Sequence, residues 1–191
     1  MDVKGKHDFE VEIGQLWNFL MDPVVLAKIT PGISKLEALG DDKFKSISEI
    51  KLGPVKGSFK GQLKVTEKDE PNFFCINMEQ LSQMGNAHVR VEMKLSKLTE
   101  QTSQLEFEGK AKLSGLIART GQRVLSGVAN VITKEVFAAL EKHIIEHKEK
   151  DTTEQEQKDI TAQEQNEKTE QKQKDITGQE QIQDHNKIQN I

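Results

Sequence analysis

Two histidines just before the low-complexity C-terminal segment are the residues that most resemble a metal site. His143-Ile-Ile-Glu-His147 places them four residues apart, so both would share one face of a helix and could bind zinc with Glu146 as a base. A zinc site needs a third ligand and a walled pocket, whereas this pair falls in the last turns of a predicted helix. Basic side chains that interact with the final carbonyl groups of the helix explain the pattern better.

Two further segments carry residue types used in catalysis or phosphate binding. The stretch from Gly53 to Gly61 is rich in glycine, but it lacks a phosphate-loop Lys-Ser/Thr pair and does not open a helix. Cys75, the single cysteine, could act as a nucleophile only beside a base such as His88. We interpret the first as a bent strand and the second as a small core or surface thiol. Because the chain also has no tyrosine, we predict no catalytic, cofactor-binding or metal site.

The residues that could instead form a site are apolar ones on the predicted strands and the last helix. Methionine and phenylalanine offer flexible and flat apolar surface, and Gly61, Gly109 and Ala111 remove volume where a core would be filled. A cavity for a hydrophobic ligand is one interpretation, and ordinary packing around a curved sheet is the other. The expected lining residues are Phe44, Phe59, Leu63, Phe74, Met78, Met93, Phe107, Leu116, Thr120 and Val124.

A long amphipathic helix is predicted from Gly115 to Lys148 and would form one wall of that cavity. Its apolar residues recur at steps of three, four and six, which places a stripe on one side, and Ser114 is expected to cap its start. Gly121 and Gly127 each cost about 1 kcal/mol relative to alanine inside a helix. They suggest close approach of the sheet, or room for a ligand, beside the first half. Residues 132–144 carry larger apolar side chains and should pack solidly.

The elements before this helix are predicted to be strands and two short helices. The helices meet at Pro23, which can end one helix and open the next. Clear alternation of apolar and polar residues predicts half-buried strands, and short connections make them antiparallel. Strands are expected at 3–11, 33–39, 43–52, 55–66, 73–81, 88–95 and 104–113. We therefore predict an α+β helix-grip fold, in which a curved antiparallel sheet of about seven strands wraps around the long C-terminal helix.

The end of the chain differs in composition from everything before it. Residues 151–191 contain ten acidic residues, five lysines and no aromatic residue, a net charge of −5. Thr153–Gln165 recurs as Thr169–Gln181 with two differences in 13 positions. Such a segment cannot bury enough apolar surface to offset the entropy lost on ordering. We predict a domain at 1–149 and a disordered, low-complexity Gln/Glu/Lys-rich tail at 150–191, with an interaction segment as the alternative.

Charge and hydropathy exclude several classes of function. The whole chain carries −4 and the tail −5, so residues 1–150 carry about +1, and a basic stripe for nucleic acid is absent. No run of about 18 apolar residues exists, so no transmembrane segment is predicted. The N-terminus has no apolar signal region, and one cysteine fits a reducing compartment. These features together predict a cytoplasmic protein.

Several short stretches occur in a characteristic order and spacing along the chain. They are Val11–Trp17 with Asp22-Pro23, Ile29–Gly32, Gly40–Phe44, Lys51–Val55 with Phe59–Gly61, Gly85–Ala87 and Gly121–Leu125. In this order and spacing they resemble the carbon monoxide dehydrogenase CoxG family, which lies within the superfamily of START and birch-pollen-allergen-like helix-grip proteins (SRPBCC). The resemblance covers roughly residues 1–147 and agrees with the predicted topology.

The resemblance implies a non-enzymatic accessory protein whose helix-grip cavity holds a hydrophobic small molecule such as a lipid or quinone. It also implies association with a molybdenum-containing oxidoreductase, in assembly, membrane recruitment or handling of the lipophilic partner. Family members can carry an apolar or amphipathic C-terminal extension, whereas this tail is acidic and anionic lipid would repel it. Peripheral membrane contact through the tail is therefore not expected.

Two alternative functions stay open on the same scaffold. A small polyketide cyclase/dehydratase-like enzyme would need ionisable groups facing the cavity, for which Glu49, Glu79, His88 and Arg90 are the candidates. A protein-interaction or chaperone-cofactor domain would instead have a solid core.

Overall fold

The computed structural model describes residues 1–53 and 55–150. Residues Met1–Ile144 form one compact unit, and a second unit begins at Ile145. The predicted tail at 151–191 lies outside the described residues.

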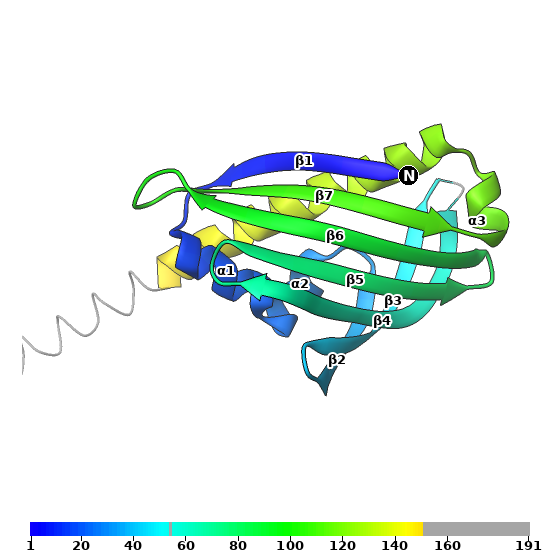
Figure 1. Ribbon diagram of the computed structural model, residues 1–191, viewed down its shortest axis with the longest axis horizontal. Helices are drawn as coiled ribbons and strands as arrows, with labels where there is room; N and C mark the ends of the chain where they lie inside the picture. Colours follow the sequence, from blue (N-terminus) through cyan, green and yellow to red (C-terminus); the bar gives the residue numbers. More distant parts are fainter. Residues whose placement is uncertain (54, 151–191) are drawn as a thin grey trace, which may run out of the picture. The chain divides into compact units, whose positions relative to one another are not determined.

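Seven strands form a single antiparallel sheet in the order β1-β7-β6-β5-β4-β3-β2 (Figure 1). Neighbouring strands in this order follow one another in the chain, except that β1 pairs with β7. The sheet curves around the helix that follows it, which confirms the predicted helix-grip fold. The bounds are β1 (Asp2–Phe9), β2 (Ile33–Gly40), β3 (Lys43–Leu52), β4 (Val55–Asp69), β5 (Phe73–Ser82), β6 (Gly85–Lys97) and β7 (Ser103–Leu113).

Positive φ angles at residues other than glycine occur in a hairpin turn and in a β-bulge. The β2–β3 hairpin turns through Asp41 and Asp42, whose φ angles of 50° and 55° are both in the left-handed region, as a type I′ turn requires. In β4 the pairing register with β5 shifts between Thr66 and Asp69, and Glu67 at this bulge has a φ of 54°. A bulge increases the local twist and re-aims the side chains beside it.

Two short helices connect β1 to β2, as predicted. They are α1 (Ile13–Met21) and α2 (Pro23–Ile29). The Asp22 carboxylate accepts a hydrogen bond of 2.7 Å from the Val24 amide, and Pro23 occupies the first helical position. Trp17 of α1 lies edge-on against Phe74 of β5, with ring centroids 5.4 Å apart. These contacts seal one end of the sheet.

The prediction of one unbroken helix from Gly115 was wrong. A short helix, α3 (Gly115–Arg119), ends at Thr120, and a separate helix, called the long helix, occupies residues 122–150. Gly121 lies between them with a φ of 94°, in the left-handed region that ends helices and that glycine adopts without strain. Ser114 does not cap α3 with its side chain either. Its hydroxyl oxygen instead accepts a hydrogen bond of 3.3 Å from the Asn86 amide.

Alternate strand residues face the long helix and form the inner face of the sheet; the others form the outer face. Inner-face residues pack into two separate hydrophobic clusters. The larger cluster includes α1, α2 and the C-terminal part of the long helix, where Leu140 is fully buried and Ile144 is 3% exposed. The solid packing predicted for residues 132–144 therefore holds at those two positions. The smaller cluster consists of Val55, Phe59, Ile117 and Leu125.

Candidate functional site

The long helix covers the inner face unevenly. Apart from Leu113, which packs against the smaller cluster, six apolar side chains on the inner face of β5, β6 and β7 are only half-buried, although β5 and β6 lie in the middle of the sheet. Core residues in such positions are normally packed on all sides. We call this set the central apolar surface: Met78, Val89, Val91, Met93, Phe107 and Ala111.

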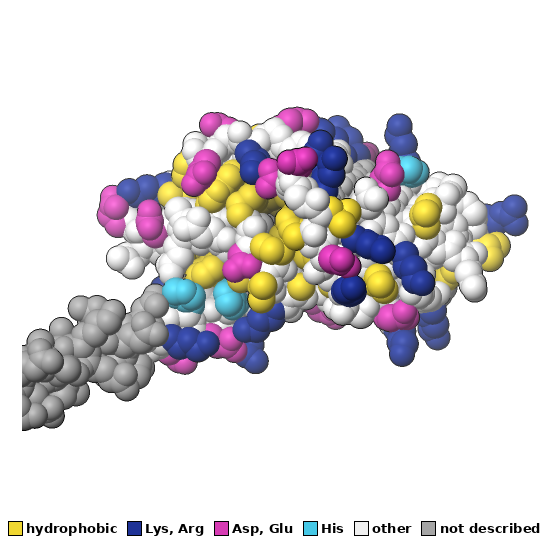
Figure 2. Space-filling model, turned by 90° about the horizontal axis from the view of Figure 1, so that it is seen from below, with side chains coloured by type: hydrophobic (Ala, Val, Ile, Leu, Met, Phe, Trp, Pro, Cys, Tyr) yellow, Lys and Arg dark blue, Asp and Glu magenta, His cyan; other side chains and the backbone are white. Residues whose placement is uncertain are grey.

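The facing part of the long helix is incompletely buried as well. Ala129, Ile132 and Val136 are half-buried, and Leu125 alone is buried among the described residues 122–139. Both walls therefore keep apolar surface that the other does not cover. Figure 2 shows hydrophobic side chains gathered on the face seen from below, with charged side chains around them.

A row of small and polar residues crosses the inner face and separates the two clusters. The strand register aligns Ser46 of β3, Gly61 of β4, Gln80 of β5 and Ala87 of β6, which we call the polar row. The Gln80 side chain passes over Gly61, and its Nε2 donates a hydrogen bond of 2.7 Å to Ser46 Oγ. A Cβ at Gly61 would overlap the carbonyl oxygen of Glu79, so the close approach of β4 and β5 requires glycine there.

One amide atom in the polar row is unpaired. Gln80 Oε1 is buried and has no hydrogen-bond partner among residues 1–53 and 55–150. Gln80 was not among the predicted site residues, although a signal was present. Along β5 the inner positions are Phe74, Ile76, Met78 and Gln80, so the glutamine breaks an otherwise apolar alternation.

His7 is a second inner-face residue that was not predicted. It lies on β1, and its Nε2 is 2.7 Å from Glu141 Oε1 on the long helix. Its ring stacks on Phe137 at 5.1 Å and meets Phe9 edge-on at 4.7 Å. Phe107 also meets Phe137 edge-on, with ring centroids 5.8 Å apart. This aromatic group joins the edge strand to the long helix beside the central apolar surface.

The predicted lining residues of the sheet all lie on its inner face, but at different depths. Three of them, Phe44, Leu63 and Phe74, are buried in the larger cluster, and Phe59 is buried in the smaller one. These four are packed by protein atoms. Met78, Met93 and Phe107 belong to the central apolar surface, where they are half-buried.

The predicted lining residues of the last helices lie around the helix break. Leu116 is 57% exposed and Val124 is 39% exposed. Thr120 directly precedes Gly121, and its hydroxyl donates a hydrogen bond of 3.4 Å to the Leu116 carbonyl. The half-buried helix residues nearer the larger cluster, Ile132 and Val136, were not among those predicted.

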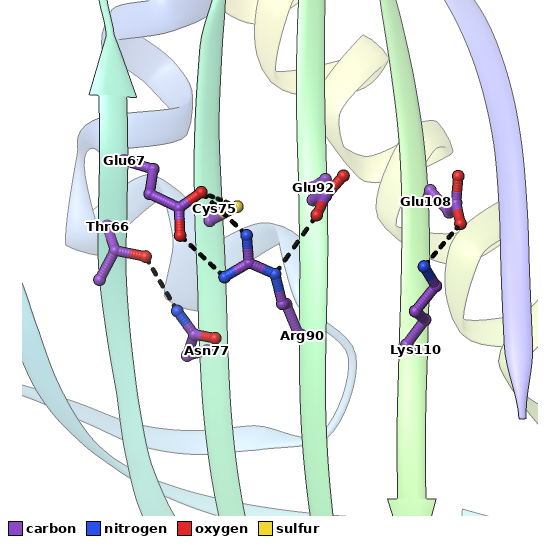
Figure 3. A network of polar contacts seen from close by, with 8 residues as sticks. All are labelled: Thr66, Glu67, Cys75, Asn77, Arg90, Glu92, Glu108 and Lys110. Atoms are coloured by element: carbon purple, nitrogen blue, oxygen red, sulfur yellow. Dashed lines mark hydrogen bonds and ion pairs between the residues drawn. The ribbon is translucent and has the colours of Figure 1, made fainter.

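The four ionisable residues considered for catalysis are on the outer face. Glu49, Glu79 and His88 are exposed, and His88 Nδ1 lies 3.7 Å from Glu79 Oε1. Arg90 is directed to Glu67, with hydrogen bonds of 2.9 and 2.8 Å from its two terminal nitrogens, and its Nε lies 3.3 Å from Glu92 Oε1 (Figure 3). These residues are therefore not positioned to act on a molecule held between the sheet and the long helix.

Cys75 lies beneath this outer-face network rather than beside His88. Its thiol donates a hydrogen bond of 3.5 Å to Glu67 Oε2, and the residue is fully buried (Figure 3). Burial raises the pKa of the Cys75 thiol to about 11; Arg90 opposes this shift and Glu67 adds to it. The hydrogen bonds from Arg90 lower the pKa of the Glu67 carboxyl. A buried thiol with a raised pKa is a poor nucleophile at neutral pH.

The histidine pair of the long helix is held by ordinary contacts at its first member. The His143 ring meets Phe19 edge-on at 4.9 Å, and Lys28 Nζ lies 3.5 Å from His143 Nδ1. Within the described parts of the chain, no three or more His, Cys, Asp or Glu side chains are grouped to hold a metal ion. None of the helices in those parts combines the length and hydropathy needed to cross a membrane.

The sequence that builds this sheet and helix matches a known family. The family model of CoxG, a subunit of carbon monoxide dehydrogenase, matches residues 5–145. The chain belongs to the CoxG family. No curated protein matches the chain.

Solved structures share the fold of this CoxG-family protein. A conserved protein from Geobacillus kaustophilus is 27% identical, with a TM-score of 0.74 over 76% of this chain and 96% of that one. A START superfamily protein from Mycobacterium smegmatis is 12% identical, with a TM-score of 0.62 over 76% and 97%. The di-domain ARO/CYC BexL from the BE-7585A biosynthetic pathway is 9% identical, with a TM-score of 0.58 over 75% and 46%. At these last two identities the likeness concerns the fold alone.

Proposed function

We propose that this CoxG-family protein is a non-catalytic accessory protein that binds a lipid- or quinone-like molecule between its sheet and the long helix. One observation carries the proposal. The central apolar surface and the residues Ala129, Ile132 and Val136 of the long helix are both half-buried. A hydrophobic molecule between them would remove this remaining apolar surface from water, which stabilises a complex by about 25 cal/mol per Å².

Thermal unfolding of delipidated protein tests this proposal. Decylubiquinone and the uncharged lipid monoolein serve as quinone-like and lipid-like probes. A ligand that binds only the folded state at 100 times its Kd adds about 2.7 kcal/mol to the free energy of unfolding. For a chain of this size that raises Tm by about 5 °C or more. No shift with either probe would contradict a hydrophobic site.

A matched pair of variants locates the site. Val89→Phe adds a large ring to the half-buried inner face, and His88→Phe adds the same ring to the exposed outer face. Because the ring at Val89 would occupy the proposed ligand space, we expect the ligand-induced rise in Tm to shrink by more than half. His88→Phe should leave it unchanged. Equal responses in both variants would place the ligand elsewhere.

An enzymatic role has less support. The acid–base candidates Glu79, His88 and Arg90 are on the outer face, and Cys75 is buried with a raised pKa. A cyclase-like enzyme would have to rely on His7, the inner-face residue paired with Glu141. The rings that pack against His7 belong to phenylalanines, which carry no proton to exchange, so non-catalytic binding fits the arrangement better.

The second part of the proposal is association with a molybdenum-containing oxidoreductase. Its support is the family itself, which is named for a subunit of carbon monoxide dehydrogenase. Affinity purification of the tagged chain from its own host, followed by metal analysis, tests it. Molybdenum should elute with the tagged protein and be absent from a mock purification. Its absence under conditions that retain the ligand would favour a carrier that acts without such an enzyme.

A further inference from the structure

The polar row gives the proposed hydrophobic site a chemical preference. The amide of Gln80 carries hydrogen-bonding capacity that the described residues do not use. Gln80 Nε2 is satisfied by Ser46 Oγ at 2.7 Å, while Gln80 Oε1 is buried and finds no partner among the described residues. Leaving a buried acceptor unpaired costs about 1–3 kcal/mol, so such groups are uncommon in folded proteins.

The surroundings of Gln80 restrict what could pair with it. On the inner face the neighbouring rows contain Leu63, Met78 and Val89 on one side and Ser48 and Phe59 on the other, and none of these is charged. An ionised ligand group would lose its hydration there without gaining a counter-charge from these sheet residues. A neutral hydrogen-bond donor loses much less. A hydroxyl group is both uncharged and able to donate a hydrogen bond to Gln80 Oε1.

The position of the row adds a second restriction. Ser46, Gly61 and Ala87 are small, and the row lies between the larger and smaller hydrophobic clusters. Ala87 and the half-buried Ile132 belong to neither cluster of the described residues. A molecule lying on the central apolar surface, which adjoins the row at Met78 and Val89, could therefore bring a polar group to Gln80.

We propose that Gln80, held by Ser46, is the polar anchor of the ligand site and selects an uncharged, mainly apolar molecule bearing a hydroxyl group that donates to Gln80 Oε1. This inference rests on the proposed function, because it assigns the specificity of the same site. Gly61 contributes by keeping β4 and β5 close and by leaving the path from Gln80 to Ser46 free of a side chain.

Binding of two matched probes to the delipidated full chain tests the assignment. 2-Naphthol and 2-methylnaphthalene have nearly the same shape, but only the first can donate a hydrogen bond. Kd values are measured by calorimetry for the wild type and for Gln80→Met, which keeps the length of the side chain and removes the amide. The preference for 2-naphthol should be about tenfold smaller in the variant, as expected for one buried hydrogen bond of about 1.4 kcal/mol.

A control on the other face separates this role from a general effect of substitution. Gln62 is exposed on the outer face of β4, next to Gly61, and pairs in register with Glu79. Gln62→Met should keep the wild-type preference. Because Gln80 is not fully paired in the unliganded protein, Gln80→Met should lower the unliganded Tm little. A large fall in Tm with an unchanged preference would show that Gln80 serves only to hold Ser46.

The remaining outcomes also decide the matter. If both probes bind and Gln80→Met leaves the preference for 2-naphthol unchanged, Gln80 is not the anchor and the hydrophobic site stands. If the dependence appears with the carbonyl probe 2-acetylnaphthalene and not with 2-naphthol, the amide donates and the hydroxyl assignment is wrong. If no probe binds, the proposed function fails and the inference fails with it.

Discussion

At the scale of single residues, the outer face shows how a sheet can hide a reactive group. Cys75 is fully buried, and its thiol donates to Glu67, which Arg90 holds by two hydrogen bonds. Glu67 reaches this place because the β4 bulge gives it a φ of 54° and re-aims its side chain. The exposed Glu67–Arg90 pair adds little stability by itself. It does cover the thiol.

The raised pKa of Cys75 makes stability fall at alkaline pH. An unfolded thiol ionises with a pKa of about 8.5, whereas the folded one does so at about 11. Between those values the unfolded chain releases a proton that the folded chain keeps, so the free energy of unfolding decreases as pH rises. Urea unfolding at pH 8 and pH 10.5 measures this. The wild type should lose about 2 kcal/mol more than Cys75→Ala; an equal loss in both proteins would contradict the assignment.

At the scale of elements, the break between α3 and the long helix gives a sharp prediction. Gly121 has a φ of 94°, and a Cβ there would meet no atom within 4 Å, so Gly121→Ala tests backbone strain alone. Left-handed φ costs an L-residue about 1–2 kcal/mol, and the variant should lose roughly that much stability. Gly127, in the helical residues 122–150, also has open space at its Cβ. Gly127→Ala should instead gain about 0.5–1 kcal/mol.

Denaturation midpoints in urea measure both changes, and the opposite signs make each variant the control of the other. Two losses of similar size would mean that alanine disturbs this surface for another reason. Two gains would mean that the chain can be helical through position 121, as the apolar periodicity suggests.

Most elements could be predicted from the sequence because one face of the sheet is dry. Alternation at Phe59–Val65 and Val89–Leu95 follows directly from that geometry. The helix break could not be predicted in this way, since apolar residues continue at helical spacing across Thr120 and Gly121. The break arises because φ at Gly121 is positive. Glycine at 121 was the available signal, and it fits the end of a helix better than its interior.

The candidate site could be predicted only as a region. Apolar periodicity identifies inner-face residues such as Phe44 and Met93. It does not reveal how closely the long helix packs against each part of the sheet. Phe44 is therefore packed into the core while Met93 is half-buried. His7 and Gln80 were missed because their contacts, with Glu141 and Ser46, join residues distant in the sequence. Polar residues at inner-face positions of a strand are the signal to follow.

At the scale of the whole molecule, we propose that the domain of residues 1–149 folds and binds independently of the acidic tail. The CoxG family match ends at residue 145, and the compact unit ends at Ile144. Deleting residues 151–191 removes a net charge of −5 and little apolar surface, so the unfolding transition rests on contacts that remain. We expect the truncated protein to keep the wild-type Tm within about 2 °C, which corresponds to less than 1 kcal/mol.

The same truncation tests how the tail affects binding to anionic membranes and to the hydrophobic ligand. Loss of the acidic repeat changes the net charge from −4 to about +1, which removes a repulsion from anionic surfaces. Sedimentation with phosphatidylglycerol vesicles at low salt should therefore retain more of the truncated protein than of the full chain, and about 0.5 M salt should abolish the difference. The rise in Tm with decylubiquinone should be the same for both proteins. A smaller rise after truncation would assign the tail to the ligand site, and stronger vesicle binding by the full chain would make the tail itself a membrane-binding segment.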